Sequence, residues 1–222
     1  MVNMEELYGE EYFARRKRAF EGGAVKIFAL EVLEWARGSL GFKFEGGRAL
    51  DIGCAHGYVV EVLAQLGYES YGVDISPIIT KGGEGFLLRA SWLNLPFPPE
   101  SFSLVTSFEV IEHLPNLEAA YQAVKEAFRI LKPGGIFVFT TPLNHPLNKL
   151  SDKIHREHHN LLWNIEAWRV FLQHFTQTFH LNSFLFLPLA RFPVKGRFHW
   201  VRLPPPLARH LMGAAIKETK LK

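Results

Sequence analysis

The sequence has a single cysteine and no long apolar run. With Cys54 alone among 222 residues, a disulfide framework within the chain is excluded, and a reducing cytoplasm is the expected location. The longest apolar run, 184–190, is too short to cross a bilayer and contains Pro188. The first residues are acidic and lack the apolar core of a secretory signal. These absences favour a cytoplasmic globular protein.

Negative charge is scarce towards the end of the chain. From Arg191 onward, Glu218 is the one acidic residue among several Lys and Arg residues, although the net charge of the whole chain is only +3. This basic tail is either a solvated surface or a contact for phosphate or an anionic membrane. Nucleic acid is a less favoured partner because the basic residues are confined to this tail. The pattern says nothing of the oligomeric state.

Aromatic residues accompany the basic ones in the same part of the sequence. We expect most of them to lie in the core. The alternative is an apolar rim that contacts a lipid-like small molecule or the surface of a membrane. These residues are Phe184, Phe186, Phe192, Phe198 and Trp200.

Short apolar segments alternate with segments of helical period, which is typical of a parallel sheet with helices on both faces. Strands are expected at 48–52, 69–74, 86–90, 102–109, 136–141, 181–187 and 197–203. Helices are expected at 10–40, with a break at Gly22-Gly23, and at 57–66, 117–131 and 165–175. The fold class is therefore α/β: a Rossmann-like three-layer sandwich whose mostly parallel seven-stranded sheet carries an antiparallel C-terminal strand pair.

We expect one domain over residues 1–222. It divides into an N-terminal helical cap at 1–44, a Rossmann-like core at 45–203 and a basic tail at 204–222. Three consecutive prolines at 204–206 suggest the end of the core, and a short amphipathic helix is the expectation after them.

A glycine loop and an acid mark the first two strands. The strand at 49–52 runs directly into Gly53–Gly57, where small residues let the backbone approach a ligand. Asp74 ends the next strand, and a carboxylate there can accept hydrogen bonds from both hydroxyls of a ribose. Tyr58–Val60 supply no third small residue, which disfavours NAD and favours a nucleoside without a pyrophosphate. Taken alone, the loop also fits an ordinary strand-to-helix turn.

Several strings in a fixed order then add to this pattern. They resemble the class I S-adenosylmethionine-dependent methyltransferases, in particular the group that includes the ubiquinone and menaquinone methyltransferases. The resemblance covers roughly residues 45–142 and is carried by the strings at 49–57, 72–76, 95–98, 101–105, 108–114 and 131–135.

The resemblance implies S-adenosyl-L-methionine as the cofactor and a set of residues that bind it. Asp51 and the loop would face its amino-acid end, Asp74 its ribose and Ile75 its adenine. Ser91 and Trp92 would lie beside the adenine edge, and the backbone of Phe108 near the methionine portion. The implied set is Tyr8, Asp51, Gly53, Cys54, Ala55, Gly57, Asp74, Ile75, Ser91, Trp92 and Phe108. The Cys54 side chain itself reads as a packed small residue rather than a reactive thiol.

Three positions depart from the family pattern. Ser91 and Ser103 stand where family members usually have acids, which weakens one adenine contact. The segment 77–85 is short and rich in glycine, so the second helix is expected to shrink to a turn.

Methyl transfer from a sulfonium is an in-line displacement, so alignment matters more than a nucleophilic triad. A general base helps only when the acceptor carries a proton that must leave. The candidates are His113, His145, His155 and His158, with His159 beside them. Segment 144–163 fits an exposed polar loop with capping histidines equally well, and Glu112 and His113 fit a helix cap. A metal site is not expected, because the spacing of these residues matches no standard zinc pattern.

The leading hypothesis is an enzyme that methylates a small molecule at oxygen, nitrogen or carbon, and the resemblance to quinone methyltransferases favours a hydrophobic acceptor. The alternatives are a non-catalytic S-adenosylmethionine-binding partner protein and an RNA or protein methyltransferase. The strand end at 107–110 lacks the Asn-Pro-Pro-Tyr string of the enzymes that methylate adenine amino groups.

Overall fold

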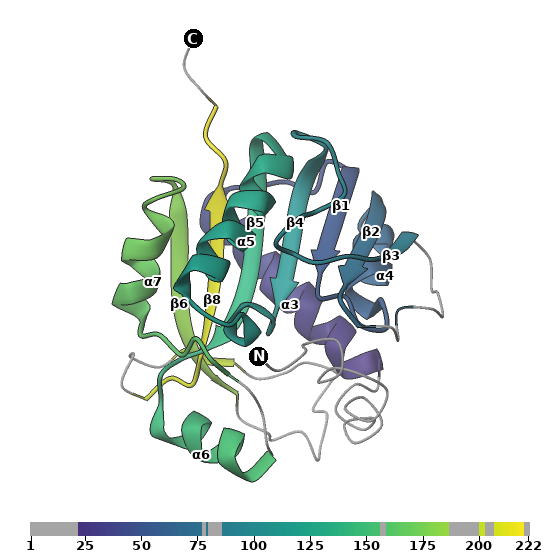
Figure 1. The fold of residues 1–222 in the computed structure, drawn as a ribbon. Coiled ribbons are helices and arrows are strands. Elements are labelled where there is room, and N and C mark those ends of the chain that lie inside the picture. The colour runs from purple at the N-terminus through teal and green to yellow at the C-terminus, as the bar shows by residue number, and fades with distance from the viewer. Residues whose placement is uncertain are drawn as a thin grey trace.

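One sheet of eight strands runs through the computed structural model (Figure 1), which describes residues 22–76, 79, 86–155, 159–186, 200–202 and 207–219. The strands are β1 (Gly47–Ile52), β2 (Tyr68–Asp74), β3 (Phe86–Arg89), β4 (Phe102–Phe108), β5 (Leu131–Pro142), β6 (Phe179–Phe186), β7 (Trp200–Arg202) and β8 (His210–Ile216). Their order across the sheet is β3-β2-β1-β4-β5-β8-β6-β7. The first five pair in parallel, and β8 pairs antiparallel with both β5 and β6.

The strand order reverses at β1, which lies between β2 and β4. From β1 the chain runs outward to β2 and β3 and then returns to β4 on the other side of β1, so the connections diverge. In open α/β sheets, ligands bind in the crevice at the carboxyl ends of such diverging strands. The register places Asp51 beside Thr106 and Ile52 beside Val73. Residues that follow β1, β2 and β4 therefore meet at one edge of the sheet.

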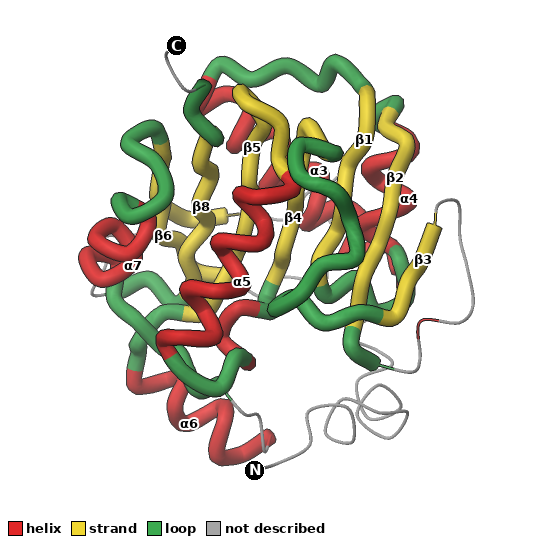
Figure 2. Tube along the Cα trace, turned by 45° about the horizontal axis from the view of Figure 1, so that its top comes forward, coloured by secondary structure: helices red, strands yellow, loops and turns green. Residues whose placement is uncertain are grey.

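Helices cover both faces of the sheet and make three layers (Figures 1 and 2). Helices α3 (Gly22–Leu40) and α4 (Tyr58–Gln65) lie on one face, and α5 (Leu117–Ile130) and α7 (Ile165–Leu172) lie on the other. A 3₁₀ turn, η2 (Ile111–His113), and helix α6 (Pro146–His155) follow β4 and β5. In both figures α6 extends beyond the edge where the parallel strands end.

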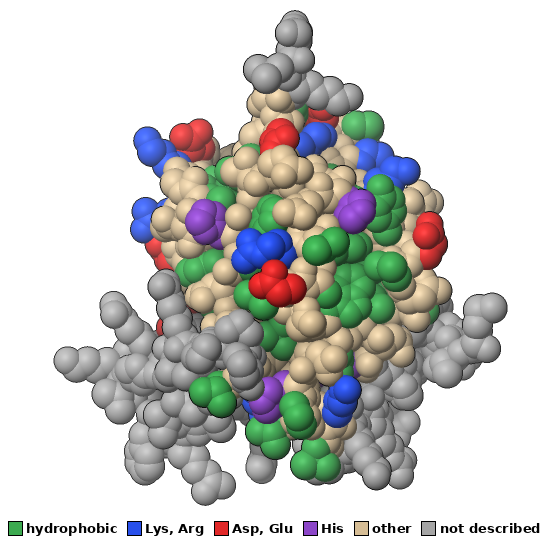
Figure 3. All heavy atoms as spheres, turned by 90° about the vertical axis from the view of Figure 1, so that its left-hand side faces the viewer, with side chains coloured by type: hydrophobic (Ala, Val, Ile, Leu, Met, Phe, Trp, Pro, Cys, Tyr) green, Lys and Arg blue, Asp and Glu red, His purple; other side chains and the backbone are tan. Residues whose placement is uncertain are grey.

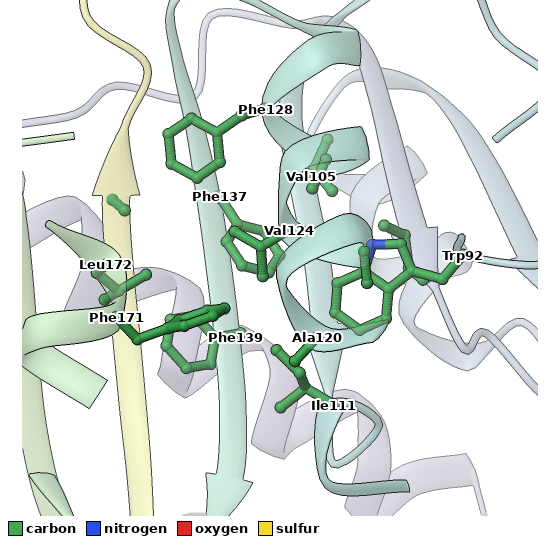
Figure 4. Packing of buried hydrophobic residues seen from close by; sticks show 14 of the residues in the cluster. Trp92, Val105, Ile111, Ala120, Val124, Phe128, Phe137, Phe139, Phe171 and Leu172 are labelled. Atoms are coloured by element: carbon green, nitrogen blue, oxygen red, sulfur yellow. The ribbon is translucent and has the colours of Figure 1, made fainter. Parts of the chain in front are cut away.

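The centre of strand β5, residues 136–139, is apolar at every position. Phe137 and Phe139 point to the face covered by α5 and α7, where Figure 4 shows them among Val124, Phe128 and Phe171. Their neighbours in the chain, Ile136 and Val138, point to the face covered by α3. A strand with both faces buried needs no polar alternation. Each buried aromatic or branched side chain contributes about 1.5–3 kcal/mol.

The predicted α/β fold class is confirmed, with one strand more than expected. The additional strand is β8, which the sequence analysis had left in the tail at 204–222. The boundary at 204 and the amphipathic helix expected after it were both wrong, because residues 210–216 form an inner strand between β5 and β6. Two basic residues near this strand are engaged as well: Arg209 donates to Asn148 Oδ1, and Lys217 donates to the carbonyl of Leu131.

Other boundaries moved by smaller amounts. Helix α3 begins at Gly22, where a break was expected, and residues 1–21 of the proposed cap lie outside the described residues. Strand β5 begins at Leu131, five residues early, through an irregular pairing with β4. Segment 144–163, read as a loop, contains α6. The expected reduction of the second helix at 77–85 falls almost wholly outside the described residues.

Substituting Gly213 tests the placement of β8. A Cβ at this position would lie 2.2 Å from the ring of Phe139, so Gly213→Ala overpacks the sheet and should lower the free energy of unfolding by about 1–3 kcal/mol. Urea denaturation measures the loss. The matched change Gly38→Ala, on the exposed side of α3 with nothing within 4 Å, should leave stability unchanged or raise it. Equal stability of the two variants would contradict the position of β8.

Candidate functional site

The loop after β1 is wound by left-handed residues. Gly53 has φ 76°, Ala55 has φ 45° and Gly57 has φ 81°. The amides of Gly53 and Cys54 both donate to the carbonyl of Val73, at 2.8 and 3.0 Å, and Gly57 donates to Cys54 at 2.7 Å. A left-handed alanine costs roughly 1–2 kcal/mol, so the surrounding bonds hold this residue in a strained conformation.

The carboxylate of Asp74 ties this loop to the end of β2. Its Oδ2 accepts the amide of Ala55 and its Oδ1 accepts the amide of Ser76, both at 2.8 Å. Burial raises the pKa of Asp74, and these amides only partly offset it. Each carboxylate oxygen has a second lone pair, so the group can still accept two hydroxyl hydrogens while it holds the loop.

A second acid, Asp51, lies beneath the loop with only 2% of its surface exposed. Thr106 of the neighbouring strand donates a 2.7 Å hydrogen bond to its Oδ1. Burial raises the pKa of Asp51 to about 8 against the effect of this hydrogen bond, and the charge of Asp74 adds to the rise. The switch point therefore holds two desolvated acids, an environment that favours a positively charged ligand group.

Two side chains bound the loop on opposite sides. The thiol of Cys54 packs towards Gly72, where a Cβ would lie 2.7 Å from Sγ, and burial with the nearby acids raises the pKa of this thiol. Cys54 is thus a packed residue, as expected, and can meet a ligand only through its backbone. On the other side, a Cβ at Gly53 would lie 2.3 Å from Val110 Cγ2. The segment after β4 therefore touches the loop.

The structure describes most of the remaining residues of the implied cofactor set. Ile75 adjoins Asp74, and Ser91 lies in the turn after β3, where its Oγ accepts the amide of Leu93. The ring of Phe108, the last residue of β4, packs edge-to-face on Phe28 of α3. Tyr8 lies outside the described residues.

The side chain of Trp92, another residue of the implied set, is buried. Its indole is 6% exposed and packs edge-to-face on Phe137, under α5 (Figure 4). Residue 92 follows a short edge strand, and its large apolar ring lies in the nearest apolar layer instead of the crevice. A contact between this residue and adenine would have to come from its backbone.

Of the two predicted base candidates whose side chains the structure describes, His113 lies in a cluster of ionisable groups and His145 does not. His113 ends η2, with its Nε2 3.8 Å from Glu112 Oε1 and its ring 5.0 Å from the ring of His159. His145 accepts the amide of Leu147 at the start of α6, as the capping alternative proposed. His155 ends α6 with its side chain undescribed, and His158 lies outside the described residues.

The capping interpretation of Glu112 and His113 was wrong, because Asn116 caps α5 by accepting the amide of Ala119. Glu112 is instead 1% exposed, and its Oε2 accepts a hydrogen bond from Thr141 Oγ1 at 3.2 Å. Its side chain is held between η2 and the end of β5.

Sequence reasoning missed a second pair at the same edge, Glu109 and His210. Glu109 directly follows β4 in a left-handed conformation, with φ 55°, and its Oε2 lies 3.3 Å from His210 Nδ1. Burial raises the pKa of Glu109, but the charge and hydrogen bond of His210, together with weaker neighbours that include His159, bring it below its ordinary value. His210 had been assigned to the tail. The continuous apolar run that follows it, residues 211–216, was the signal for a buried strand.

Glu112, His113 and His159 offer ligand atoms that all lie within 4.8 Å of one another. They form the one such group found among the described residues.

Among the residues that the structure describes, no helix combines the length and hydropathy needed to cross a bilayer.

The basic aromatic tail does not form one surface in the described residues. Phe184 is fully buried and stacks on His210, whereas Phe192 and Phe198 lie outside the described residues and the side chains of Phe186 and Trp200 are not described. On the face drawn in Figure 3, basic side chains are scattered among acidic and apolar ones. A concentrated basic patch is therefore missing from that face.

Comparison with known proteins identifies the family to which the chain belongs. A family model described as a methyltransferase domain matches residues 28–185. A probable S-adenosylmethionine-dependent methyltransferase of Mycolicibacterium smegmatis is 31% identical over 108 residues, which are 46% of this chain and 41% of that protein. A ubiquinone biosynthesis O-methyltransferase of Azoarcus sp. is 31% identical over 119 residues, 49% of each chain. This chain thus spans about half the length of the curated relatives it matches.

Solved structures with the same fold cover nearly the whole chain. A methyltransferase from Thermotoga maritima, described as a possible histamine N-methyltransferase, aligns with a TM-score of 0.66 at 21% identity over 94% of this chain and 99% of that one. A SAM-dependent methyltransferase from Archaeoglobus fulgidus aligns with a TM-score of 0.69 at 16% identity over 94% and 100%. At these identities the likeness shows the fold alone.

The buried acid Asp51 makes stability depend on pH. The pKa of Asp51 is about 4 in the unfolded chain and about 8 in the folded one. The stability that this acid contributes is fully present below about pH 4 and is lost as the pH rises through about 8. Urea denaturation between pH 5 and 9 should show Asp51→Asn losing less stability than the unmodified chain, by at least about 1 kcal/mol. Glu118→Gln, the same change on the exposed surface of α5, should keep the original pH dependence. Parallel curves for Asp51→Asn and the unmodified chain would contradict the desolvation of this acid.

Proposed function

Because the chain belongs to the class I S-adenosylmethionine-dependent methyltransferases, we propose that it transfers the methyl group of S-adenosylmethionine to a small-molecule acceptor at the edge where β1, β2 and β4 end. The observation that carries this proposal is the carboxylate of Asp74, which holds the loop through Ala55 while it keeps acceptor capacity for a ribose. The residues after β4 adjoin the same loop through Val110.

The crevice fits this cofactor on the chemistry of its residues. The glycine loop presents backbone rather than side chains, as close approach of a ligand requires. Asp51, desolvated beside Asp74, would be stabilised as a carboxylate by the ammonium group of the methionine portion. The bound sulfonium supplies an activated methyl group, so the protein has to align an acceptor atom with it and exclude water.

Polar side chains gather where that acceptor would lie. Glu109 follows β4 and is paired with His210, and His113 and His159 lie nearby. Hydrogen-bonding groups at this edge suit an acceptor hydroxyl or amine, and Glu109 is placed to orient it. The relatives named as ubiquinone biosynthesis O-methyltransferases favour an oxygen acceptor. Leu147 and Leu150, each 52% exposed on α6 beyond this edge, favour an apolar one.

Cofactor binding tests the first half of the proposal. In calorimetric titration with S-adenosylhomocysteine, Asp74→Ala should bind about tenfold to hundredfold more weakly, because it removes a charged acceptor of hydrogen bonds. Glu69→Ala, on the opposite end of β2 and paired with Arg48 at the surface, should bind as the unmodified chain does. Circular dichroism identifies any unfolded variant, and Asp74→Asn then replaces the alanine. Binding by Asp74→Ala equal to that of the unmodified chain would refute the site.

Turnover tests the second half. With S-adenosylmethionine labelled in its methyl group, label should pass to small phenols in preference to amines. Glu109→Gln should lower kcat/KM by at least about tenfold, the loss typical of one positioned polar group. The same variant should keep its affinity for S-adenosylhomocysteine, since Glu109 lies on the acceptor side. Labelling of RNA or protein instead, or binding without any turnover, would contradict a small-molecule acceptor.

A further inference from the structure

Two short segments, far apart in the sequence, are joined at the end of β4. The amides of Asn160 and Leu161 both donate to the carbonyl of Glu112, at 2.8 and 3.1 Å, and the side chain of Asn160 donates to the carbonyl of His113 at 3.2 Å. These three bonds fix the segment at 159–161 against η2. The histidine at the start of that segment is thereby brought beside the histidine that ends η2.

The side chains that meet there have the composition of a metal centre. Glu112 Oε2 accepts the hydroxyl of Thr141, which leaves Oε1 on the side of His113 Nε2, 3.8 Å away. The rings of His113 and His159 are 5.0 Å apart, and one ligand atom from each of the three residues falls within 4.8 Å of the others. Two imidazoles and a carboxylate are the protein ligands of one common class of zinc site.

From this geometry we propose that Glu112, His113 and His159 bind one divalent transition-metal ion, of which Zn²⁺ is the best match. Ligands about 2.0–2.1 Å from a tetrahedral ion lie roughly 3.4 Å from each other, so small side-chain rotations close the present spacing. The ion compensates the charge of a carboxylate that is 1% exposed. Mg²⁺ and Ca²⁺ prefer oxygen ligands, so two nitrogen ligands argue against them.

The surroundings of the cluster support an ion in two further ways. Thr141 orients the carboxylate in the manner of an outer hydrogen-bond partner, a role that metal sites commonly need. Three protein ligands also leave a fourth tetrahedral position for water. That position lies on the acceptor side of the crevice, an assignment that rests on the proposed function, whereas binding of the ion does not.

Calorimetric titration of the tag-free, chelator-treated full chain with ZnCl₂ tests the site. We expect one ion per chain and a rise in Tm on binding. His159→Ala and Glu112→Gln should each weaken Zn²⁺ binding by at least about tenfold, since even outer partners of a metal site are worth that much. His174→Ala is the matched control, because that ring lies in the turn after α7, bonds to carbonyls of that helix and should leave binding unchanged.

Substitution with Co²⁺ gives a second readout. Visible absorption bands of a four-coordinate ion should appear in the unmodified chain and in His174→Ala, and they should be lost in His159→Ala. If Glu112→Gln fails to fold, His159→Ala decides, because its ring lies in a loop. Equal Zn²⁺ affinity of the unmodified chain and His159→Ala would overturn the proposal, as would an equal loss in His174→Ala.

Titration with S-adenosylhomocysteine separates this proposal from the proposed function. His159→Ala should bind that ligand as the unmodified chain does. Zn²⁺ binding by a chain that takes up no cofactor would refute the proposed function and leave the metal site standing. Cofactor binding by a chain that takes up no Zn²⁺ would do the reverse.

Discussion

The site depends on one carboxylate that makes two backbone hydrogen bonds. Asp74 accepts the amides of Ala55 and Ser76, and so joins the loop after β1 to the end of β2. These bonds stabilise the left-handed conformation of Ala55, which is unfavourable by itself. The same two bonds hold the carboxylate where β1 and β2 end. Shape and charge of the cofactor site therefore have a common origin.

The adjoining edge is built from elements that are distant along the chain. Glu109 and Glu112 follow β4, His159 comes from the loop before α7, and His210 begins β8. What brings them together is the order of strands in the sheet, with β8 inserted antiparallel beside β5. A parallel strand in that place would put its first residue at the opposite edge, and His210 would then not lie beside Glu109.

The sequence was sufficient for the parts of the site that are local. The glycines and Asp74 lie within one β-α-β unit, so their spacing along the chain predicts that they lie close together. It was insufficient for β8, because Gly213 and the alanines after it are weak strand formers and the prolines before it resemble a domain end. The small residues there reflect the ring of Phe139, which is a tertiary constraint. The orientation of the Trp92 ring is likewise set by a tertiary contact, its packing against Phe137. His159 and Glu112 could not be linked by spacing, because backbone bonds between remote segments join them.

The late position of β8 in the chain has a consequence for how the protein comes into being. A ribosome makes β1 to β5 long before residues 210–216, so a nascent chain carries β5 and β6 without the strand that separates them. Domains generally fold as units during synthesis, and unpaired strand edges are prone to aggregation until their partners arrive. Glu109 gains its histidine only at that final step. Vectorial synthesis therefore brings His210 to Glu109 only after the residues of the loop at 53–57 have been made.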